Sequence, residues 1–277
     1  MSLENSESVT TTPKISIVMA AYNEELTISK AIDSICAQTF NDWELIIIDD
    51  GSTDSTADVV RRYIDKDSRI RFVRNKTNMK LPTSLNKGIR LAKADLIARA
   101  DADDINLPER LAKQFAFMQA HPEVDVLGTG AYLLDATGKR INAVLLQQTH
   151  ENFEKLPLIK THFFHPSVMI RRRFFEVAGY YNTSFLRAED KELWLRGLNL
   201  GCRYANLEEP LIEYSTNEYS RKWRSIMSRT LSLLHIVRIY RVKRGYTQVF
   251  LLFAYSAAIK MGIYKPKSIR SDRFPRK

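Results

Sequence analysis

Three carboxylates within four positions, Asp101, Asp103 and Asp104, are the residues of this sequence whose type and spacing most clearly suit chemistry. They follow the run Asp95-Leu96-Ile97-Ala98, which is typical of a buried β-strand. Clustered carboxylates repel one another, and a cation between them relieves that repulsion. Their oxygens suit Mg²⁺ or Mn²⁺, above all when substrate phosphates complete the coordination shell. The cluster therefore indicates nucleotide-diphosphate chemistry; the alternative is a solvated acidic turn before a helix.

Two other predicted strand ends carry polar residues. The segment Asp49-Asp50-Gly51-Ser52-Thr53-Asp54 has the composition of a turn. A carboxylate there could also accept the imide N–H of uracil, a donor that cytosine lacks. The segment Ala20-Ala21-Tyr22-Asn23-Glu24 is either a strand-to-helix junction or a loop that binds a base. In the second case Tyr22 stacks on the base and backbone N–H groups are offered to the nucleotide.

The second half of the chain supplies a candidate base and candidate phosphate ligands. Glu189-Asp190 begins a predicted helix, where it either caps the helix or provides a general base for an attacking hydroxyl. His165 is either a satisfied buried histidine or a contact to a diphosphate or a metal. Arg171-Arg172-Arg173 is either a solvated surface or the source of one bidentate phosphate ligand.

Four strand–helix units are expected to position the first of these groups. The predicted strands are 15–21, 43–48, 70–73 and 95–98, and the predicted helices begin near 23, 56, 82 and 108. This alternation predicts a parallel sheet covered on both faces. Right-handed crossovers place Tyr22, Asp49-Asp50 and the acids 101–104 along one edge, where ligands of open α/β sheets bind.

After residue 121 the pattern changes. We predict strands at 124–128, 131–134 and 165–170 and an amphipathic helix at 189–200. This region is interpreted as the second half of the same domain, shaped for a second substrate. The apolar stretch 248–264 is interrupted by Lys260, and it is shorter and more polar than a spanning helix usually is.

The net charge of +10 is unevenly distributed along the 277 residues. Residues 220–277 contain 15 Lys and Arg against one acid, Asp272, while the rest of the chain has a net charge of −4. Such a basic segment suggests an anionic membrane surface or nucleic acid. With its apolar stretch it suits an interfacial helix, and a helical pair packed on the domain is the alternative.

The remaining composition fits a cytoplasmic protein with one large domain. A hydrophobic content of 44% supports a substantial core. Residues 1–13 are polar, and we predict that they are disordered and form no secretion signal. Cys36 and Cys202 lack metal-ligand spacing, so we interpret them as free thiols in a reducing compartment.

In their order and spacing these segments resemble glycosyltransferase family 2, whose members have the GT-A fold. The resemblance covers about Lys14 to about Tyr214. It rests on Ser16–Glu24, Gln38-Thr39-Phe40, Glu44–Asp54, Ser84–Gly88, the Asp-x-Asp motif Asp101-Ala102-Asp103 with Asp104, His165–Arg171 and Glu189–Arg196. The implied fold is an α/β, mostly parallel Rossmann-like sheet with helices on both faces, plus a C-terminal helical extension.

The resemblance also implies a division of the chain. Residues 14–217 would form the catalytic domain, with a nucleotide-sugar half at 14–122 and an acceptor half at 123–217. Residues 218–277 would form the basic helical extension.

The implied activity is an inverting, metal-dependent transfer of a sugar from a nucleotide-sugar to a hydroxyl acceptor. If Asp50 recognises the base, the donor is a UDP-sugar. Asp190 would be the catalytic base. The cofactor would be Mn²⁺ or Mg²⁺ on Asp103, with Asp101 and His165 as further candidate ligands. The nucleotide and donor residues would be Ala20, Tyr22, Glu24, Asp50, Asp101, Ala102 and Asp103; the acceptor or diphosphate residues would be His165, Arg171, Glu189 and Trp194.

Bacterial relatives often act on lipid-linked sugars, so the expected acceptor is a lipid-linked or polysaccharide glycan at the cytoplasmic membrane face. Attachment would be peripheral, and no nucleic-acid partner is expected. The chain departs from the family at Lys80, where Asn-x-Gly is frequent, at Lys191, where an aromatic residue is common, and at Ser215, where Arg is frequent. These departures concern acceptor contacts more than donor contacts.

Three alternatives stay open at this point. A sugar nucleotidyltransferase also uses acids and a metal, but it usually has a Gly-rich basic loop after its first strand, and residues 20–24 contain no Gly, Lys or Arg. A non-catalytic nucleotide-sugar-binding protein would share the donor site without turnover. A nucleic-acid-binding protein would use the basic segment and show steeply salt-dependent binding.

Overall fold

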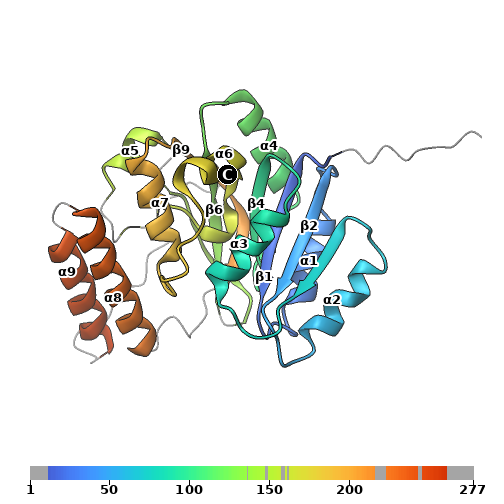
Figure 1. Ribbon diagram of the computed structural model, residues 1–277, viewed down its shortest axis with the longest axis horizontal. Coiled ribbons are helices and arrows are strands. Elements are labelled where there is room, and N and C mark those ends of the chain that lie inside the picture. Colours follow the sequence, from blue (N-terminus) through green and yellow to red (C-terminus); the bar gives the residue numbers. More distant parts are fainter. Residues whose placement is uncertain are drawn as a thin grey trace, which may run out of the picture.

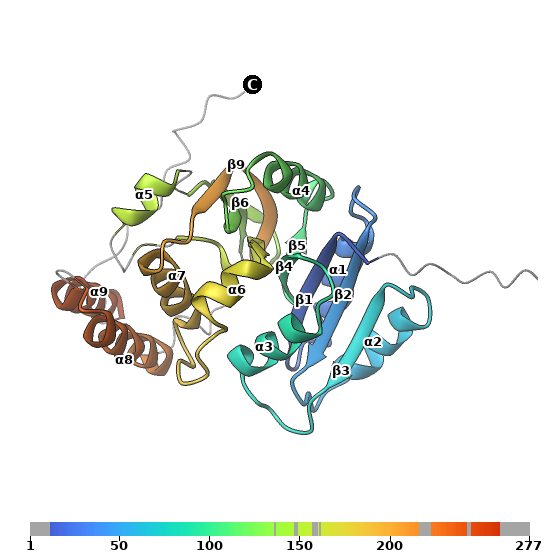
Figure 2. The same cartoon turned by 45° about the horizontal axis from the view of Figure 1, so that its top comes forward.

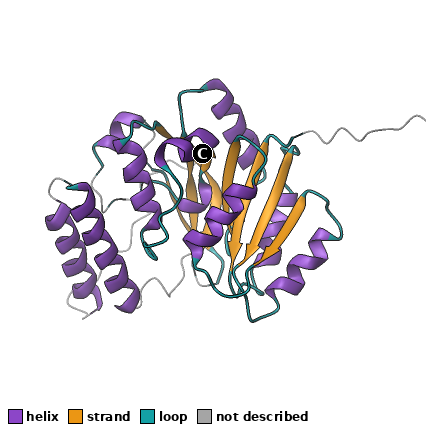
Figure 3. Cartoon of the chain, viewed as in Figure 1, coloured by secondary structure: helices purple, strands orange, loops and turns teal. Residues whose placement is uncertain are grey.

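The computed structural model describes residues 12–135, 137–146, 149–156, 160, 162–215, 223–242 and 245–260. In this part of the chain nine strands form one sheet in the order β3-β2-β1-β4-β8-β6-β9-β5, and β7 pairs with β6. Helices cover both faces of the sheet, and two further helices lie beside one end of it (Figures 1 and 3). Of the segment predicted to be disordered, 1–13, residues 1–11 lie outside the described residues, and so do residues 261–264 of the apolar stretch 248–264.

The first half of the chain confirms the predicted alternation. Its elements are β1 (Ile15–Ala21), α1 (Ile28–Cys36), β2 (Trp43–Asp49), α2 (Thr56–Ile64), β3 (Ile70–Arg74), α3 (Leu81–Leu91), β4 (Leu96–Asp101) and α4 (Arg110–Ala120). Strands β3, β2, β1 and β4 are parallel neighbours. The chain passes from β1 outward to β2 and β3, and α3 then returns it to β4 on the other side of β1. The carboxyl ends of β1 and β4 therefore flank a reversal of strand order, the usual ligand position in such sheets.

Alternating side chains of the central strands pack in two separate cores, one on each face of the sheet. Ile17 and Met19 of β1 pack with α1 and α4 on one face, and Val18 packs with α3 on the other. Each strand is apolar on both faces because both faces are covered. Consequently the strand ends, where the chain leaves these cores, are the places where polar side chains reach solvent.

The second half is mixed rather than parallel. Its elements are β5 (Ile105–Asn106), β6 (Val126–Leu134), β7 (Arg140–Val144), α5 (His150–Glu154), β8 (Met169–Arg171), α6 (Arg172–Ala178), α7 (Glu189–Asn199) and β9 (Tyr204–Ser215). Strand β8 is antiparallel to both β4 and β6, whereas β6 and β9 are parallel. The two strands predicted at 124–134 are one continuous strand.

Two predicted element boundaries are wrong for identifiable reasons. The helix expected from Asn23 begins at Ile28, because Asn23 has a left-handed φ of 57° and the next backbone N–H groups are bound by another loop. The strand expected from His165 begins only at Met169, because His165–Ser167 forms a 3₁₀ turn. Pro166 lacks the N–H that a ladder needs, which favours a turn there.

The run Arg171-Arg172-Arg173 is a structural anchor instead of a solvated surface. Arg171 Nε donates to Val124 O at 2.8 Å, and Arg172 Nη2 donates to Ala92 O at 2.8 Å. Arg173 Nε donates to the carboxylate of Asp125 at 2.7 Å. These bonds tie β8 and α6 to the amino-terminal end of the sheet, opposite the carboxyl ends of β1 and β4.

The C-terminal extension is helical, as predicted. Helices α8 (Trp223–Tyr240) and α9 (Gly245–Lys260) form a hairpin that lies beside α7 in both views (Figures 1 and 2). A small core joins the hairpin to the loop before α7, and it contains Phe185, Ala188, Leu233, Ile236, Val237 and Val249. The Tyr240 hydroxyl donates to Glu192 Oε1 of α7 at 2.5 Å. The hairpin is thus attached to the helix that begins with Glu189-Asp190.

Within the described residues, none of the helices has the length and apolar character needed to cross a membrane. Cys36 and Cys202 are both free thiols, as predicted.

Candidate active site

The loops that follow β1 and β2 at their carboxyl ends are joined by hydrogen bonds. The backbone N–H of Asn23 donates to Ser52 Oγ at 3.0 Å, and that of Glu24 donates to Thr56 Oγ1 at 2.8 Å. In return the Thr53 N–H donates to Asn23 Oδ1 at 2.9 Å. These bonds fix the chain on both sides of Tyr22, whose ring remains 42% exposed. Tyr22 is therefore presented at the sheet edge as a platform for a planar ligand.

Asp50 is buried and held by three donors, all on the same oxygen. Asn75 Nδ2, the backbone N–H of Met79 and Ser84 Oγ each donate to Asp50 Oδ1 at 2.8 Å. Lys87 Nζ donates to Asn75 Oδ1 at 2.8 Å and so fixes the orientation of that amide. The other oxygen, Oδ2, takes none of these bonds, and Asp50 lines a pocket. Its arrangement suits a carboxylate that accepts an N–H from a ligand.

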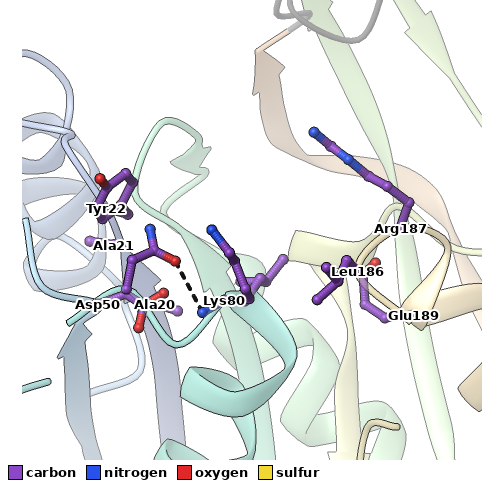
Figure 4. A pocket seen from close by; sticks show the side chains of 10 residues that line it. Ala20, Ala21, Tyr22, Asp50, Lys80, Leu186, Arg187 and Glu189 are labelled. Atoms are coloured by element: carbon purple, nitrogen blue, oxygen red, sulfur yellow. Dashed lines mark hydrogen bonds between the residues drawn. The ribbon is translucent and has the colours of Figure 1, made fainter. Parts of the chain in front are cut away.

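The pocket has a volume of about 430 Å³. Ala20, Ala21, Tyr22 and Asp50 form one wall, Leu186, Arg187 and Glu189 form the opposite wall, and Lys80 lies between them (Figure 4). Asn78 and Leu81 also line the pocket. Residues from the first and second halves of the chain therefore face the same space. Four of the predicted site residues, Ala20, Tyr22, Asp50 and Glu189, line it.

The acidic cluster lies at the adjoining strand end. Ligand oxygens of Asp101, Asp103 and Asp104 all lie within 4.8 Å of one another. Arg99 binds Asp101 through a hydrogen bond of 2.6 Å from Nη1 to Oδ2. Register places Asp101 beside Ala20, so the cluster adjoins the wall formed by β1. Ala102 is 3% exposed and its methyl packs in the core, so only its backbone could contact a donor.

Strand β9 closes the acidic loop from the other side. The backbone N–H of Ser215 donates to Asp104 Oδ1 at 2.7 Å, and Ser215 Oγ donates to Asp103 O at 2.6 Å. Asp104 is 2% exposed, and its second oxygen, Oδ2, has no hydrogen-bond partner. An orphaned buried carboxylate oxygen beside two further carboxylates fits the oxygen ligand set that hard divalent cations take.

The electrostatics of the acids agree with that fit. Burial, and then the charges of Asp101 and Asp103, raise the pKa of Asp104 well above its usual range. Burial raises the pKa of Glu24 to about 7, and Asp103 and Asp101 add to the effect. The predicted donor residue Glu24 therefore lies within the electrostatic field of the cluster. A divalent cation among these oxygens would remove the smaller part of both shifts, the part that comes from repulsion between the carboxylates.

Glu189 and Asp190 begin α7 on the opposite side of the site. The preceding residue, Ala188, has a left-handed φ of 59°, which turns the chain sharply into the helix. Burial and then the charge of Asp190 raise the pKa of Glu189 to about 7. After burial, the charges of Asp101, Asp104 and Asp190 all raise the pKa of the Tyr214 hydroxyl. Asp190 therefore shares one electrostatic neighbourhood with the acidic cluster, although it is 89 positions away from Asp101 in the sequence.

His165 lies at the edge of this neighbourhood. Its Nε2 is hydrogen-bonded to the Tyr181 hydroxyl, 2.7 Å away. Burial and then the charge of Arg99 lower the pKa of His165 well below its usual value, so the ring is neutral. Among the described residues, the only cluster of side chains close enough together to hold a metal ion consists of Asp101, Asp103 and Asp104. The predicted role of His165 as a metal ligand stays a prediction.

The predicted base Asp190 is next to Glu189 but is not among the residues that line the pocket, and Trp194 and Arg171 are occupied elsewhere in the fold. Trp194 is 1% exposed and packs in the core against Phe163 and Phe174, with ring centroids 5.2 and 5.9 Å away. Arg171 pairs with Leu96, at the start of β4, and its guanidinium is occupied by backbone carbonyls. Direct phosphate binding by Arg171 is therefore contradicted by its position.

Sequence reasoning missed several residues that hold the site together. The role of Arg99 could have been predicted, because a charged residue inside a buried strand needs a charged partner such as the nearby Asp101. The roles of Asn75, Ser84 and Ser215 could not, because each acts through a bond to a residue that is distant in the sequence.

Replacing Glu189 with Gln should change the pH dependence of stability. The pKa of Glu189 is about 7 in the folded protein, against a reference value of 4.5, so between pH 4.5 and pH 7 the folded protein holds a proton that the unfolded chain has released. The free energy of unfolding therefore falls as the pH rises through this range. The part of the loss that occurs above pH 5.5 is about 1–2 kcal/mol. Thermal unfolding in EDTA at pH 5.5 and pH 8 should show a smaller difference for Glu189→Gln than for the wild type. The exposed carboxylate of α6 gives the matched control, Glu176→Gln; an unaltered difference in Glu189→Gln would contradict the prediction.

Comparison with known proteins agrees with this geometry. Residues 16–179 match the family described as Glycosyl transferase family 2. A Bacillus subtilis protein named as the glycosyltransferase EpsE is 34% identical over 94% of this chain and 96% of its own length. The O-antigen biosynthesis glycosyltransferase WbnJ of Escherichia coli is 33% identical over 74% of this chain and 81% of its own.

Solved structures share the fold at lower identity. TarS of S. aureus in complex with UDP has a TM-score of 0.60 and 20% identity, covering 80% of this chain and 65% of that chain. The mannosyltransferase PcManGT of Pyrobaculum calidifontis, in complex with GDP-Man and Mn²⁺, has a TM-score of 0.65 and 17% identity, covering 92% of this chain and 77% of that chain. The fold is therefore the GT-A fold that the sequence predicts. Because the family model matches residues 16–179, more than half of the chain, and a relative 34% identical covers 94% of it, the chain belongs to glycosyltransferase family 2.

Proposed function

We propose that this protein is an inverting, metal-dependent glycosyltransferase that moves a sugar from a UDP-sugar to a hydroxyl of a lipid-linked or polysaccharide glycan. The observation that carries the proposal is the convergence of Asp50, the acidic cluster and Glu189-Asp190 around one edge of the sheet. A nucleotidyltransferase has no support from the family, and a non-catalytic binder would not need the second pair of acids.

The donor half of the proposal rests on Asp50 and Tyr22. Because three donors fix Asp50 Oδ1, the other oxygen is oriented before a ligand arrives, and it can accept the imide N–H of uracil. Tyr22 offers its exposed ring for stacking on the base. An Escherichia coli relative, 29% identical over 80% of this chain and 81% of its own length, is named UDP-Gal:alpha-D-GlcNAc-diphosphoundecaprenol beta-1,3-galactosyltransferase. Its name supports both a UDP-sugar donor and a lipid-linked acceptor for this chain.

The metal half of the proposal assigns Mn²⁺ or Mg²⁺ to Asp103, with Asp101 and Asp104 beside it. When bound, the cation supplies positive charge where the departing nucleoside diphosphate develops negative charge. Arg99 holds the carboxylate of Asp101, and Ser215 holds the loop that carries Asp103. These two residues fix the position of the acids before the substrate binds.

Inversion follows from the number of catalytic groups. Asp190 takes the proton of the acceptor hydroxyl, whose oxygen attacks the anomeric carbon as the diphosphate leaves. One displacement inverts the configuration at that carbon. Retention by double displacement would need a protein nucleophile on the opposite face of the sugar, a role that this proposal gives to no residue.

The test separates donor binding from transfer. Thermal unfolding is measured with UDP, GDP and dTDP, each with and without MnCl₂, and release of nucleoside diphosphate from the matching sugar nucleotides follows. We expect UDP with MnCl₂ to stabilise the protein most and UDP-sugars to be hydrolysed slowly without acceptor. The product configuration is then read by NMR. Stabilisation by none of the nucleotides, or release of a retained sugar, would refute the proposal.

The membrane part of the proposal rests on the outer face of the hairpin. Phe250 and Leu251 of α9 are 69% and 58% exposed, and Ile239 of α8 is 49% exposed beside the exposed cation Arg238. Apolar side chains flanked by cations suit an anionic lipid surface. The hairpin also packs on the domain, so both interpretations of the basic segment can hold together.

Replacing Phe250 and Leu251 together with Glu should reduce flotation with anionic liposomes several-fold, because two apolar contacts become repulsive charges. Catalytic release of UDP in solution should be unchanged. Ile141 of β7, which is 61% exposed, gives the matched control Ile141→Glu. Equal flotation of wild type and double variant would exclude this face as the lipid contact.

A further inference from the structure

Lys80 has a backbone conformation that only glycine adopts without strain. Its φ is 72° and its ψ is 154°, at the position immediately before α3. L-residues avoid this region because the Cβ crowds the backbone, and outliers that persist cluster at functional sites. On the adjoining loop a positive φ, 77°, is adopted by a glycine, Gly51, as is usual. A Cβ at Gly51 would lie 2.7 Å from the carbonyl carbon of Thr77.

The backbone around Lys80 is fixed from both sides. The Met79 N–H donates to Asp50 Oδ1 at 2.8 Å, and the Lys80 N–H donates to Asn78 Oδ1 at 3.1 Å. On the other side the Lys80 carbonyl accepts from the N–H groups of Thr83 and Ser84, at 3.1 and 3.2 Å. The turn itself is therefore set by Asp50 and by the start of α3. A glycine would satisfy every one of these bonds, so the turn does not explain the lysine.

The side chain of Lys80 extends into the pocket. It lines the pocket between the two walls, and its ammonium points to the space between Tyr22 and Arg187 (Figure 4). Within the described residues the ammonium forms no ion pair with a protein carboxylate. It is thus an exposed cation directed at the volume in which the proposed donor lies.

We propose that Lys80 binds the phosphates of the nucleotide donor and that this contact is the reason for a strained non-glycine residue at this position. The inference rests on the proposed function. An ammonium is a compact point charge that suits phosphate oxygens, whereas the flat base is matched by the Tyr22 ring and the Asp50 carboxylate. Three ionised aspartates outweigh the charge of one divalent cation, so the cluster with its cation supplies no net positive charge. Lys80 supplies part of the charge that a nucleoside diphosphate requires.

Replacing Lys80 with Gly should move stability and binding in opposite directions. The variant relieves the strained backbone, so its thermal unfolding midpoint should rise. It also removes the ammonium, so its affinity for UDP in MnCl₂ should fall about tenfold or more. Its affinity for uridine, which has no phosphate, should stay within about twofold. Lys80→Arg should retain most of the UDP affinity, and Lys76→Ala, on the same loop, is the charge-matched control.

The outcomes separate this inference from the function on which it rests. If the wild type binds UDP and Lys80→Gly binds it equally well, the phosphate assignment is wrong and the proposed function stands. If uridine and UDP weaken by the same factor, Lys80 acts on the base or on the pocket, which also overturns the assignment. If the wild type binds neither UDP nor GDP, the proposed function itself fails. A lower unfolding midpoint in Lys80→Gly would show that the lysine is structural.

Discussion

Asp103→Asn should reduce the Mn²⁺-dependent release of nucleoside diphosphate from the donor by roughly two to three orders of magnitude. The amide keeps the size of the side chain but removes its charge, so the cation loses a ligand and the leaving group loses stabilisation. The measurement is the rate of UDP release against MnCl₂ concentration. Mn²⁺ should also cease to raise the thermal unfolding midpoint in the presence of UDP.

The control for this variant lies at the opposite end of β4. Asp95 precedes β4 at its other end, and its side chain is 96% exposed, so Asp95→Asn removes an equal charge far from the cluster. Its rate should match that of the wild type. A wild-type response to Mn²⁺ in Asp103→Asn would show that the aspartates are not the metal site.

Asp190→Asn should reduce turnover by roughly two or more orders of magnitude while donor binding survives. The variant keeps a polar side chain of the same shape at the start of α7 but cannot take the proton of the acceptor. Binding of UDP by calorimetry and release of UDP from the donor are measured on the same preparation. A loss of both would indicate a damaged pocket instead of a missing base.

The neighbouring carboxylate provides the sharpest control for Asp190. Glu189 lines the pocket and its pKa is raised to about 7, so it too could act as a base near neutral pH. If Asp190 is the base, Glu189→Gln should lose far less activity than Asp190→Asn. The reverse order would assign the proton transfer to Glu189.

Sequence alone predicted the first half of the fold because its signals are local. Each parallel strand is buried on both faces, so 15–21 and 43–48 appear as mostly apolar runs with one polar residue each, Ser16 and Glu44, and each helix shows an apolar stripe. Once those strands are parallel, topology alone brings Asp50 and the acids after β4 to one edge. That rule, and no direct signal of contact, is why the position of these acids at one edge of the sheet could be predicted.

The second half depends on long-range contacts that no short window of sequence contains. Strand β8 is three residues long and pairs with β4 and β6, so its extent was overestimated. The anchoring role of Arg171 was missed because its acceptors are backbone carbonyls about 50 positions away. The same holds for Ser215, where a departure from the family suggested acceptor contacts. Its hydroxyl and N–H instead hold the acidic loop.

The attachment of α8 and α9 has a consequence for how this protein would respond to a surface. Phe185 and Ala188, which pack against the hairpin, directly precede Glu189-Asp190, and Tyr240 is bonded to Glu192 one turn further along α7. A small rotation of the hairpin would therefore shift Asp190, the proposed base, relative to the acidic cluster, the proposed metal site. If the hairpin binds lipid as proposed, contact with a bilayer and the rate of sugar transfer would be mechanically linked, and the lipid environment would influence the speed of the reaction as well as its place.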